Sequence, residues 1–263
     1  MQFATLPNPK QEMREMKIIV PVKIVPDDQD IQVAADGSLD YSKAKPTIST
    51  YDLNAIEAAA QLAGADGSVV VISVGPKSID DSKTKKGILA RGVSELYMAA
   101  DDSLAGLDAF ATASSLAALV AEVGEYDLIL CGDGSADNYA QQTDVQLACR
   151  LGLPVVNAAC KIEAADGGIK VESVLEDTVE TVICPLPAVV SVCPDIAVPR
   201  IPGMKDILAA GKKPMHAVAA AAEPSAIEVL EVKAPEQADR KQEIMDASDD
   251  NIAKFVAAIK AAL

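Results

Sequence analysis

Residues 126–154 read YDLILCGDGSADNYAQQTDVQLACRLGLP, and this stretch indicates the architecture of the chain. It joins an apolar run at 127–130, a polar loop with Gly132 and Gly134, and a segment from Tyr139 onward with the apolar spacing of an amphipathic helix. This order is typical of one strand–helix unit in a parallel sheet. The first N–H groups of such a helix have no partner within it, and they favour an anion. The sequence therefore predicts a phosphate-binding loop after this strand.

The predicted loop carries neutral hydrogen-bond donors but no motif of nucleotide hydrolysis. Gln141, Gln142 and Thr143 can donate to phosphate oxygens where we expect the helix to begin. The chain has no Walker lysine motif and no G-x-G-x-x-G. Asp133 and Asp137 are two spaced carboxylates without a third ligand, so we interpret them as solvated loop residues and predict no metal site.

The rest of the first half alternates between apolar runs and helical spacing. This alternation predicts a doubly wound, mainly parallel, Rossmann-like α/β sheet that binds ligands at the carboxyl ends of its strands. Pro21 removes a backbone donor, so the first strand should bend or leave its pairing near that residue. The expected strands are 17–24, 69–74 and 95–98, and the expected helices are 51–63, 79–91 and 107–123.

After Pro154 the pattern changes to a β-hairpin section. Asp166, Gly167 and Gly168 form a strong turn signal between two alternating runs, and five prolines between 185 and 202 predict an extended, rigid loop. An extended polar segment and an amphipathic helix at 249–263 predict a C-terminal arm. The expected divisions are a loose leader at 1–16, an α/β domain at 17–194, a loop at 195–216 and the arm at 217–263.

Composition excludes several classes of protein. A formal charge of −16 argues against a nucleic-acid-binding surface, and the absence of tryptophan removes the best stacking platforms for bases. The sequence contains a single histidine, His216, which argues against a Ser/His/Asp triad and against a metal site built from histidines. The five cysteines form no C-x-x-C pair, and we expect them to be small buried residues. Without an apolar 18-residue run or a secretory signal, we expect a cytoplasmic protein with no membrane span.

Four segments resemble the β subunit of electron transfer flavoproteins, in the FixA branch linked to anaerobic carnitine metabolism. The similarity extends over nearly everything from Lys17 onward, with two departures. Ser173 stands where the family usually has a basic residue, and Ser49 stands where many members have asparagine. The segments are 17–23 (KIIVPVK), 50–59 (TYDLNAIEAA), 130–143 (LCGDGSADNYAQQT) and 171–191 (VESVLEDTVETVICPLPAVVS).

The resemblance implies a sheet of the adenine-nucleotide-binding type in a heterodimer. A FixB-like α subunit would carry the redox-active FAD and would be contacted by the C-terminal arm and helix. This chain would bind AMP, or a second FAD in an electron-bifurcating member. The implied nucleotide-binding residues are Pro21, Ser49, Thr50, Tyr51, Asp52, Val74, Gly132, Asp133, Gly134, Ser135, Ala136, Asp137, Asn138, Tyr139, Ala140, Gln141, Gln142 and Thr143.

The resemblance also implies a recognition loop for acyl-CoA dehydrogenases or quinone-reductase-type partners. Its residues would be Arg200, Ile201, Pro202 and Met204, with Ile201 or Met204 as the apolar anchor. The protein would then be an electron carrier rather than an enzyme. An ordinary surface loop stiffened by prolines remains the alternative for this segment.

Two other functional classes can use a similar sheet. A stand-alone adenine-nucleotide sensor of the universal-stress-protein type usually has a G-x-x-G loop followed by a Gly-Ser/Thr pair, and that spacing is absent after Leu130. An adenylating enzyme with a Ser-Gly-Gly-x-Asp-Ser loop would need glycines after its first strand. The chain has Pro21, Val22 and Lys23 there. The electron-transfer subunit is therefore the favoured interpretation, and the sensor is the alternative.

Overall fold

The computed structural model describes residues 15–219, 223–236 and 242–262, which divide into two compact units. The first unit holds the α/β fold, and the second comprises residues 33–39 and the part of the chain after 230. Of the predicted leader, only Glu15 and Met16 lie within the described residues. Met16 is buried, and its carbonyl accepts a hydrogen bond from the Ser68 N–H group. Met16 therefore belongs to the folded unit rather than to the predicted leader.

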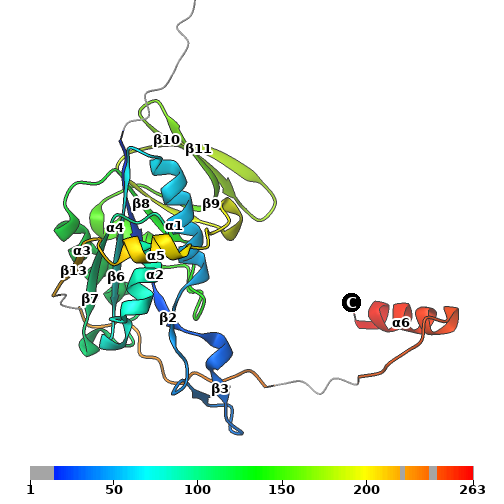
Figure 1. Ribbon diagram of the computed structural model, residues 1–263. Helices are drawn as coiled ribbons and strands as arrows, with labels where there is room; N and C mark the ends of the chain where they lie inside the picture. Colours follow the sequence, from blue (N-terminus) through cyan, green and yellow to red (C-terminus); the bar gives the residue numbers. More distant parts are fainter. Residues whose placement is uncertain (1–14, 220–222, 237–241, 263) are drawn as a thin grey trace, which may run out of the picture. The chain divides into compact units, whose positions relative to one another are not determined.

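A nine-stranded sheet forms the centre of the described part of the first unit, in the order β11-β10-β9-β12-β8-β1-β6-β7-β13 (Figure 1). All neighbours from β9 to β13 in this order pair in parallel, whereas β10 runs antiparallel to both β9 and β11. The antiparallel strands thus lie at one edge of a doubly wound sheet, as predicted. The strands are β1 (Lys17–Pro21), β6 (Ser68–Gly75), β7 (Glu95–Ala100), β8 (Leu128–Gly132), β9 (Val155–Ala165), β10 (Gly168–Val174), β11 (Val179–Pro185), β12 (Ala188–Val192) and β13 (Met215–Ala217).

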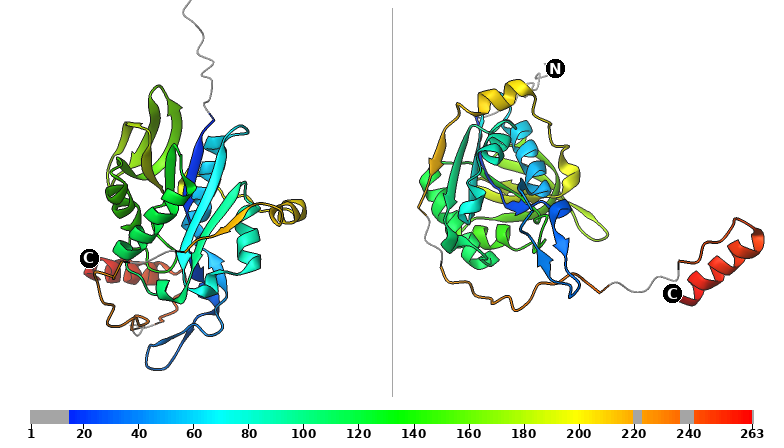
Figure 2. Two further views of the ribbon diagram at one scale, coloured as in Figure 1. Left: turned by 90° about the vertical axis from the view of Figure 1, so that its left-hand side faces the viewer. Right: turned by 60° about the horizontal axis from the view of Figure 1, so that its bottom comes forward.

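Helices cover both faces of the sheet and create two hydrophobic cores (Figures 1 and 2). One core packs apolar residues of α1, α2 and α5 against one face. The other packs α3 and α4 against the opposite face. Because side chains alternate along a strand, Ile18 and Val20 of β1 belong to the first core and Ile19 to the second. These helices are α1 (Thr50–Ala63), α2 (Ser82–Leu89), α3 (Ala109–Val123), α4 (Thr143–Leu151) and α5 (Met204–Ala210).

Short elements complete the described chain. In two small sheets, β2 (Ile24–Pro26) pairs antiparallel with β5 (Pro46–Ile48), and β3 (Gln32–Val33) pairs with β4 (Leu39–Asp40). The 3-10 helices are η1 (Asp28–Asp30), η2 (Lys77–Ile79), η3 (Asp102–Leu104) and η4 (Pro194–Ile196). The second unit contains α6 (Asp249–Ala262), which has no buried residue and exposes Ile252 and Phe255. None of the helices in the described ranges is long and apolar enough to cross a membrane.

Several sequence expectations need adjustment. The helix expected at 79–91 is the shorter α2, because Asp81 caps its N-terminus by accepting a hydrogen bond from the Thr84 N–H group. The expectation that all five cysteines are buried was wrong, since Cys149 is exposed on α4.

The Asp166–Gly167 turn is confirmed between β9 and β10, where Gly167 has a φ of 78°. Ser173 is buried and donates its hydroxyl to the Asn157 carbonyl.

Candidate functional site

The candidate site lies where β1 and β8 end at the same edge of the sheet. These two strands are parallel neighbours, with Ile18 paired to Leu128, and the chain winds outward from β1 in one direction and from β8 in the other. Such a reversal of strand order is the usual place for a ligand in an open α/β sheet. The loops after both strands and the start of α1 bring together residues 21–23, 49–52 and 132–139, whereas residues 140–143 lead from this cluster into α4.

The bend predicted at Pro21 is confirmed. β1 ends at Pro21, and the Val22 N–H group still donates to the Ile72 carbonyl at 2.9 Å. The next N–H group, of Lys23, turns away from the sheet and donates to Asp52 Oδ2 at 2.7 Å. The chain then continues into β2, which pairs with β5 instead of the main sheet. The bend therefore directs Lys23 toward the start of α1 and the loop after β8.

Lys23 contacts the loop after β8 through its side chain. Its Nζ lies 2.8 Å from Asp137 Oδ1 and 2.7 Å from Oδ2, and the Ser135 hydroxyl donates to Oδ1 at 2.6 Å. Burial alone would raise the pKa of Asp137, but the hydrogen bonds from Lys23 and Ser135 lower it below its ordinary value. The sequence interpretation did not include Lys23 among the site residues, although it lies only two positions after Pro21.

The start of α1 packs directly on the end of β8. A Cβ atom on Gly132 would lie 2.8 Å from Asp52 Oδ1 and 2.9 Å from the Tyr51 backbone carbon, so only glycine fits this approach. Asp52 is buried, and this burial raises its pKa to about 7 despite the opposing hydrogen bond from the Lys23 backbone. The fully buried Ser49 accepts a hydrogen bond from the Ala136 N–H group at 3.3 Å. The structure therefore joins the predicted 49–52 and 132–137 segments.

Tyr139 folds back over the loop. Its hydroxyl donates to Asp133 Oδ2 at 2.9 Å, and its ring centroid lies 4.9 Å from that of Tyr51. A Cβ atom on Gly134 would lie 2.2 Å from the Tyr139 ring, so this position also requires glycine. The hydrogen bond to Asp133 is the main reason that the pKa of Tyr139 rises to about 12. Burial raises the pKa of Asp133, and within the described ranges its buried Oδ1 has no hydrogen-bond partner.

The helix predicted to start at Tyr139 starts at Thr143 instead. Tyr139 and Gln141 adopt positive φ angles of 44° and 54°, which a continuous right-handed helix cannot contain. The packing of Tyr139 against Gly134 and Tyr51 thus overrides the helical spacing. The N-cap residue, Gln142, makes no side-chain capping hydrogen bond. The first N–H groups of α4 therefore receive no acceptor from the N-cap side chain.

The ionisable side chains around this loop are mostly carboxyl groups, and burial raises the pKa of Asp52 and of Asp133. Asp52, Asp133 and Asp144 are buried and Asp137 is exposed, and Lys23 already pairs with Asp137. Each of these carboxyl groups repels a phosphate when it is ionised, so the donors best suited to a phosphate are the backbone N–H groups at the start of α4. Within the described residues, no group of three or more His, Cys, Asp or Glu side chains could hold a metal ion.

The remaining predicted site residues occupy two other settings. Val74 lies one residue before the end of β6 and packs on the core formed with α3 and α4. In the proline-rich loop, the Arg200 side chain pairs with the nearly buried Glu57 of α1, with Nε 2.6 Å from Oε2 and Nη2 3.0 Å from Oε1. Asn54 of α1 also donates to the Pro194 and Ala197 carbonyls, at 2.9 and 2.8 Å.

Anchoring of this loop leaves its apolar side chains in solvent. Ile201 is 94% exposed and Met204 is 76% exposed, and Val198 and Leu208 are also exposed. The exposure of Ile201 and Met204 fits both the docking loop that the resemblance implies and an ordinary surface loop, and the sequence interpretation did not include the Glu57–Arg200 pair.

Comparison with known protein families adds an assignment that agrees with this architecture. Residues 38–223 match the electron transfer flavoprotein domain, and this region includes α1, most of the main sheet, the loop after β8 and the proline-rich loop. The match extends over well over half of the chain, so the chain belongs to the electron transfer flavoprotein domain family.

Proposed function

We propose that this chain is the β subunit of a heterodimeric electron transfer flavoprotein of the FixA branch. The family consists of electron carriers rather than enzymes, which supports a role in shuttling electrons between dehydrogenases and an acceptor. An α subunit would carry the FAD that exchanges those electrons. The proposed setting is cytoplasmic, and the branch resemblance favours anaerobic carnitine metabolism.

The observation that supports nucleotide binding most strongly is the loop of residues 132–143 at the reversal of strand order. Gly132 and Gly134 allow backbone and ring contacts that a Cβ atom would block, and α4 begins beside them without a side-chain cap. This arrangement fits an adenine nucleotide whose phosphate is held by backbone N–H groups of the first turn of α4. Asp133 and Ser135 supply polar oxygens for uncharged hydroxyl groups of the same ligand.

We propose AMP as the nucleotide, with a second FAD as the alternative. AMP would fill the site and stabilise the folded subunit by binding it preferentially. FAD bound there would add a second redox centre to the heterodimer. In either case Lys23, Ser49 and Asp52 would fix the loop that holds the ligand, and they would take no part in bond breaking.

The proposed partner surfaces are the proline-rich loop and the C-terminal arm. Ile201 and Met204 are exposed apolar side chains on a loop anchored by Arg200, which suits the docking of a redox partner such as an acyl-CoA dehydrogenase. The apolar side chains of α6 suit contact with the α subunit. The Glu57–Arg200 pair would hold the loop in place before the partner binds.

One purification tests the proposal. The full chain is co-expressed with a FAD-bearing partner subunit, and the nucleotides released from each subunit are identified by mass spectrometry. We expect a stable heterodimer with AMP in this chain and no flavin absorbance when the chain is isolated. A yellow isolated chain would replace AMP with FAD. A chain that binds AMP but no partner would instead support the stand-alone sensor, and a chain without nucleotide would contradict the proposed site.

A further inference from the structure

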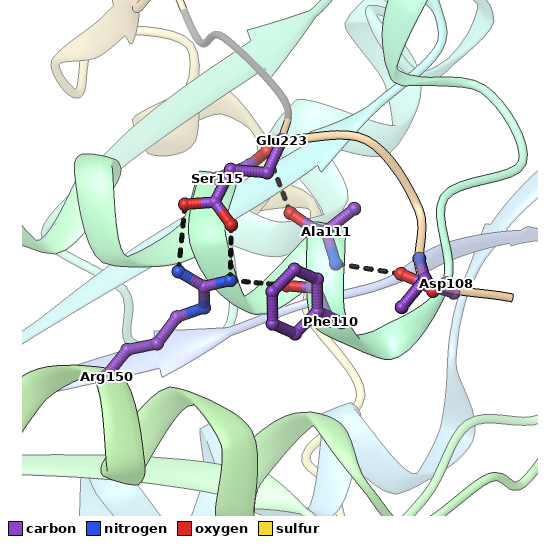
Figure 3. A network of polar contacts seen from close by, with 7 residues as sticks. Asp108, Phe110, Ala111, Ser115, Arg150 and Glu223 are labelled. Atoms are coloured by element: carbon purple, nitrogen blue, oxygen red, sulfur yellow. Dashed lines mark hydrogen bonds and ion pairs between the residues drawn. The ribbon is translucent and has the colours of Figure 1, made fainter.

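A polar network outside the nucleotide site holds the segment that leads to the C-terminal arm (Figure 3). Arg150, at the end of α4, forms a bidentate salt bridge with Glu223: Nη1 lies 3.0 Å from Oε1, and Nη2 lies 2.7 Å from Oε2. The guanidinium group also lies 4.4 Å from the centre of the Phe110 ring of α3. A planar guanidinium held on an aromatic face is already oriented for such a pair.

Asp108 makes the second attachment, a few residues further along the segment. Its Oδ1 accepts a hydrogen bond from the Ala111 N–H group at 2.8 Å and so caps α3. Its Oδ2 accepts from the N–H groups of Ala226 and Ile227, at 2.6 and 3.0 Å. The Ser225 hydroxyl in turn accepts a hydrogen bond from the Asp108 N–H group at 3.2 Å. The Asp108 carboxylate therefore caps α3 and also holds the backbone of Ala226 and Ile227.

The attached segment contains few features that would hold it without these contacts. Residues 223–230 form no helix or strand, and Pro224 restricts the backbone between the two attachments. Directly after the attachments, three apolar side chains point into solvent: Ile227 is 64% exposed, Val229 68% and Leu230 88%. A polar contact that holds exposed apolar groups in one place reduces the conformational entropy that is lost when a partner binds them.

We propose that Asp108 and Arg150 form a clamp, and that this clamp presents Ile227, Val229 and Leu230 to the FAD-bearing partner subunit. The proposal rests on the proposed heterodimer. Three exposed apolar side chains surround the exposed Glu228, so the complementary partner surface is apolar with a basic group facing Glu228. Asp108, Arg150 and Glu223 are positioning residues, because they fix the segment and leave its apolar side chains free for the partner.

The substitution Asp108→Asn tests the clamp without removing the cap. Asparagine keeps an acceptor for the Ala111 N–H group and is itself a good N-cap residue, but its amide nitrogen cannot accept from Ala226 and Ile227. Glu223→Gln tests the other attachment by removing the charge that pairs with Arg150. The matched control is Asp81→Asn, because Asp81 caps α2 in the same way and the described residues give it no contact with this segment.

Two measurements on the full-length chain decide the proposal. Hydrogen exchange followed by mass spectrometry should show the Ala226 and Ile227 amides exchanging about tenfold faster in Asp108→Asn and Glu223→Gln, but not in Asp81→Asn. The complex with the co-purified FAD-bearing subunit should then dissociate about three- to tenfold faster in the two clamp variants. Unchanged exchange would show that no clamp forms in solution. Faster exchange with unchanged dissociation would show that the partner does not use the clamped segment.

A failure of the proposed function has a different signature. If the unmodified chain forms no complex with any FAD-bearing subunit, the heterodimer and the presentation of the segment are both contradicted. The exchange measurement still decides whether the clamp exists, because it needs no partner.

Discussion

Lys23 and Asp137 join two loops that are 114 residues apart in the sequence, with 2.7 Å between Lys23 Nζ and Asp137 Oδ2. The pair connects the bend after β1 to the loop after β8, on either side of the strand reversal. Both side chains are partly exposed, so solvent weakens the contribution of this pair to the stability of the fold. Its main effect should be on the conformation of residues 135–137.

Replacing Lys23 should therefore impair nucleotide binding more than folding. We expect Lys23→Gln to lower the affinity for AMP about three- to tenfold while the thermal midpoint stays nearly constant, measured by calorimetric titration and thermal unfolding. Lys43→Gln is the control, because Lys43 is exposed and hydrogen-bonds only to Gln32 among the described residues. Equal AMP affinities for the two variants would contradict the role assigned to Lys23.

Gly132 should be intolerant of even a methyl group. A Cβ atom there would lie within 3 Å of Tyr51 and Asp52, so Gly132→Ala should separate α1 from β8 and lower the free energy of unfolding by about 1–3 kcal/mol. Gly87→Ala is the matched control, because Gly87 lies within α2 and a Cβ atom there would be 3.6 Å from the nearest atom, Nη1 of Arg91. That change should stabilise the chain by about 0.5–1 kcal/mol. Urea denaturation measures both values, and equal effects would refute the close approach at Gly132.

Asp52 should make the stability of the chain fall as the pH rises toward neutrality. Its folded-state pKa of about 7 lies above the ordinary value of 3.8, so between these values the folded state holds a proton that the unfolded state has released. The stabilisation is complete below about pH 4 and is lost as the pH rises through 7. Over this range the free energy of unfolding falls by up to about 1.4 kcal/mol per pH unit. Urea denaturation across this range measures the slope, and Asp52→Asn should flatten it. An identical slope in the variant would assign the effect to another group.

Much of this architecture could be predicted from the sequence because it depends on local patterns. The alternation of apolar strands and helices gave the doubly wound sheet, Pro21 gave the bend, and Asp166–Gly167 gave the hairpin turn. The loop at 139–142 could not be predicted in the same way, because the backbone there depends on the packing of Tyr139 against Tyr51. Helical spacing carries no information about a partner that lies 88 positions earlier in the chain.

Long-range polar pairs escaped the sequence interpretation for the same physical reason. Lys23 with Asp137, Glu57 with Arg200, and Arg150 with Glu223 each join segments that the topology brings together. A charge at one position can pair with any opposite charge that the fold places nearby, and composition alone does not select among them. Here the pairs fix the loop after β8, the proline-rich loop and the lead-in to the arm.

Ile201 and Met204 should contribute to redox-partner docking but not to nucleotide binding. Both are strongly exposed, so replacing them with alanine removes apolar contact area for a partner and leaves the folded core intact. We expect the double variant to slow electron transfer from the dehydrogenase about tenfold, measured by stopped-flow absorbance, with AMP retained. The double variant Val174→Ala/Leu175→Ala is the control, since these two side chains are exposed at the end of β10. Equal rates in the two double variants would refute the docking role.

Arg200 should be more important for stability than its exposed position suggests. Its guanidinium group is the main reason that the pKa of Glu57 lies below its ordinary value, and the Glu57 side chain is only 8% exposed. Arg200→Ala would leave this carboxylate without its cation, so we expect the free energy of unfolding to fall by about 1–3 kcal/mol at neutral pH.

The loss should depend on pH, because the depressed pKa of Glu57 stabilises the fold above the unfolded-state pKa and this stabilisation disappears as the pH falls through the folded-state value. The difference between the native chain and Arg200→Ala should therefore shrink in acid. Adding Glu57→Gln to Arg200→Ala should recover part of the lost stability at neutral pH, because it removes the unpaired charge. Lys161→Ala, which breaks the exposed pairs of Lys161 with Glu163 and Glu172, is the control and should leave the urea midpoint nearly unchanged. A loss in Arg200→Ala that is the same at all pH values would show that packing, not charge pairing, anchors this loop.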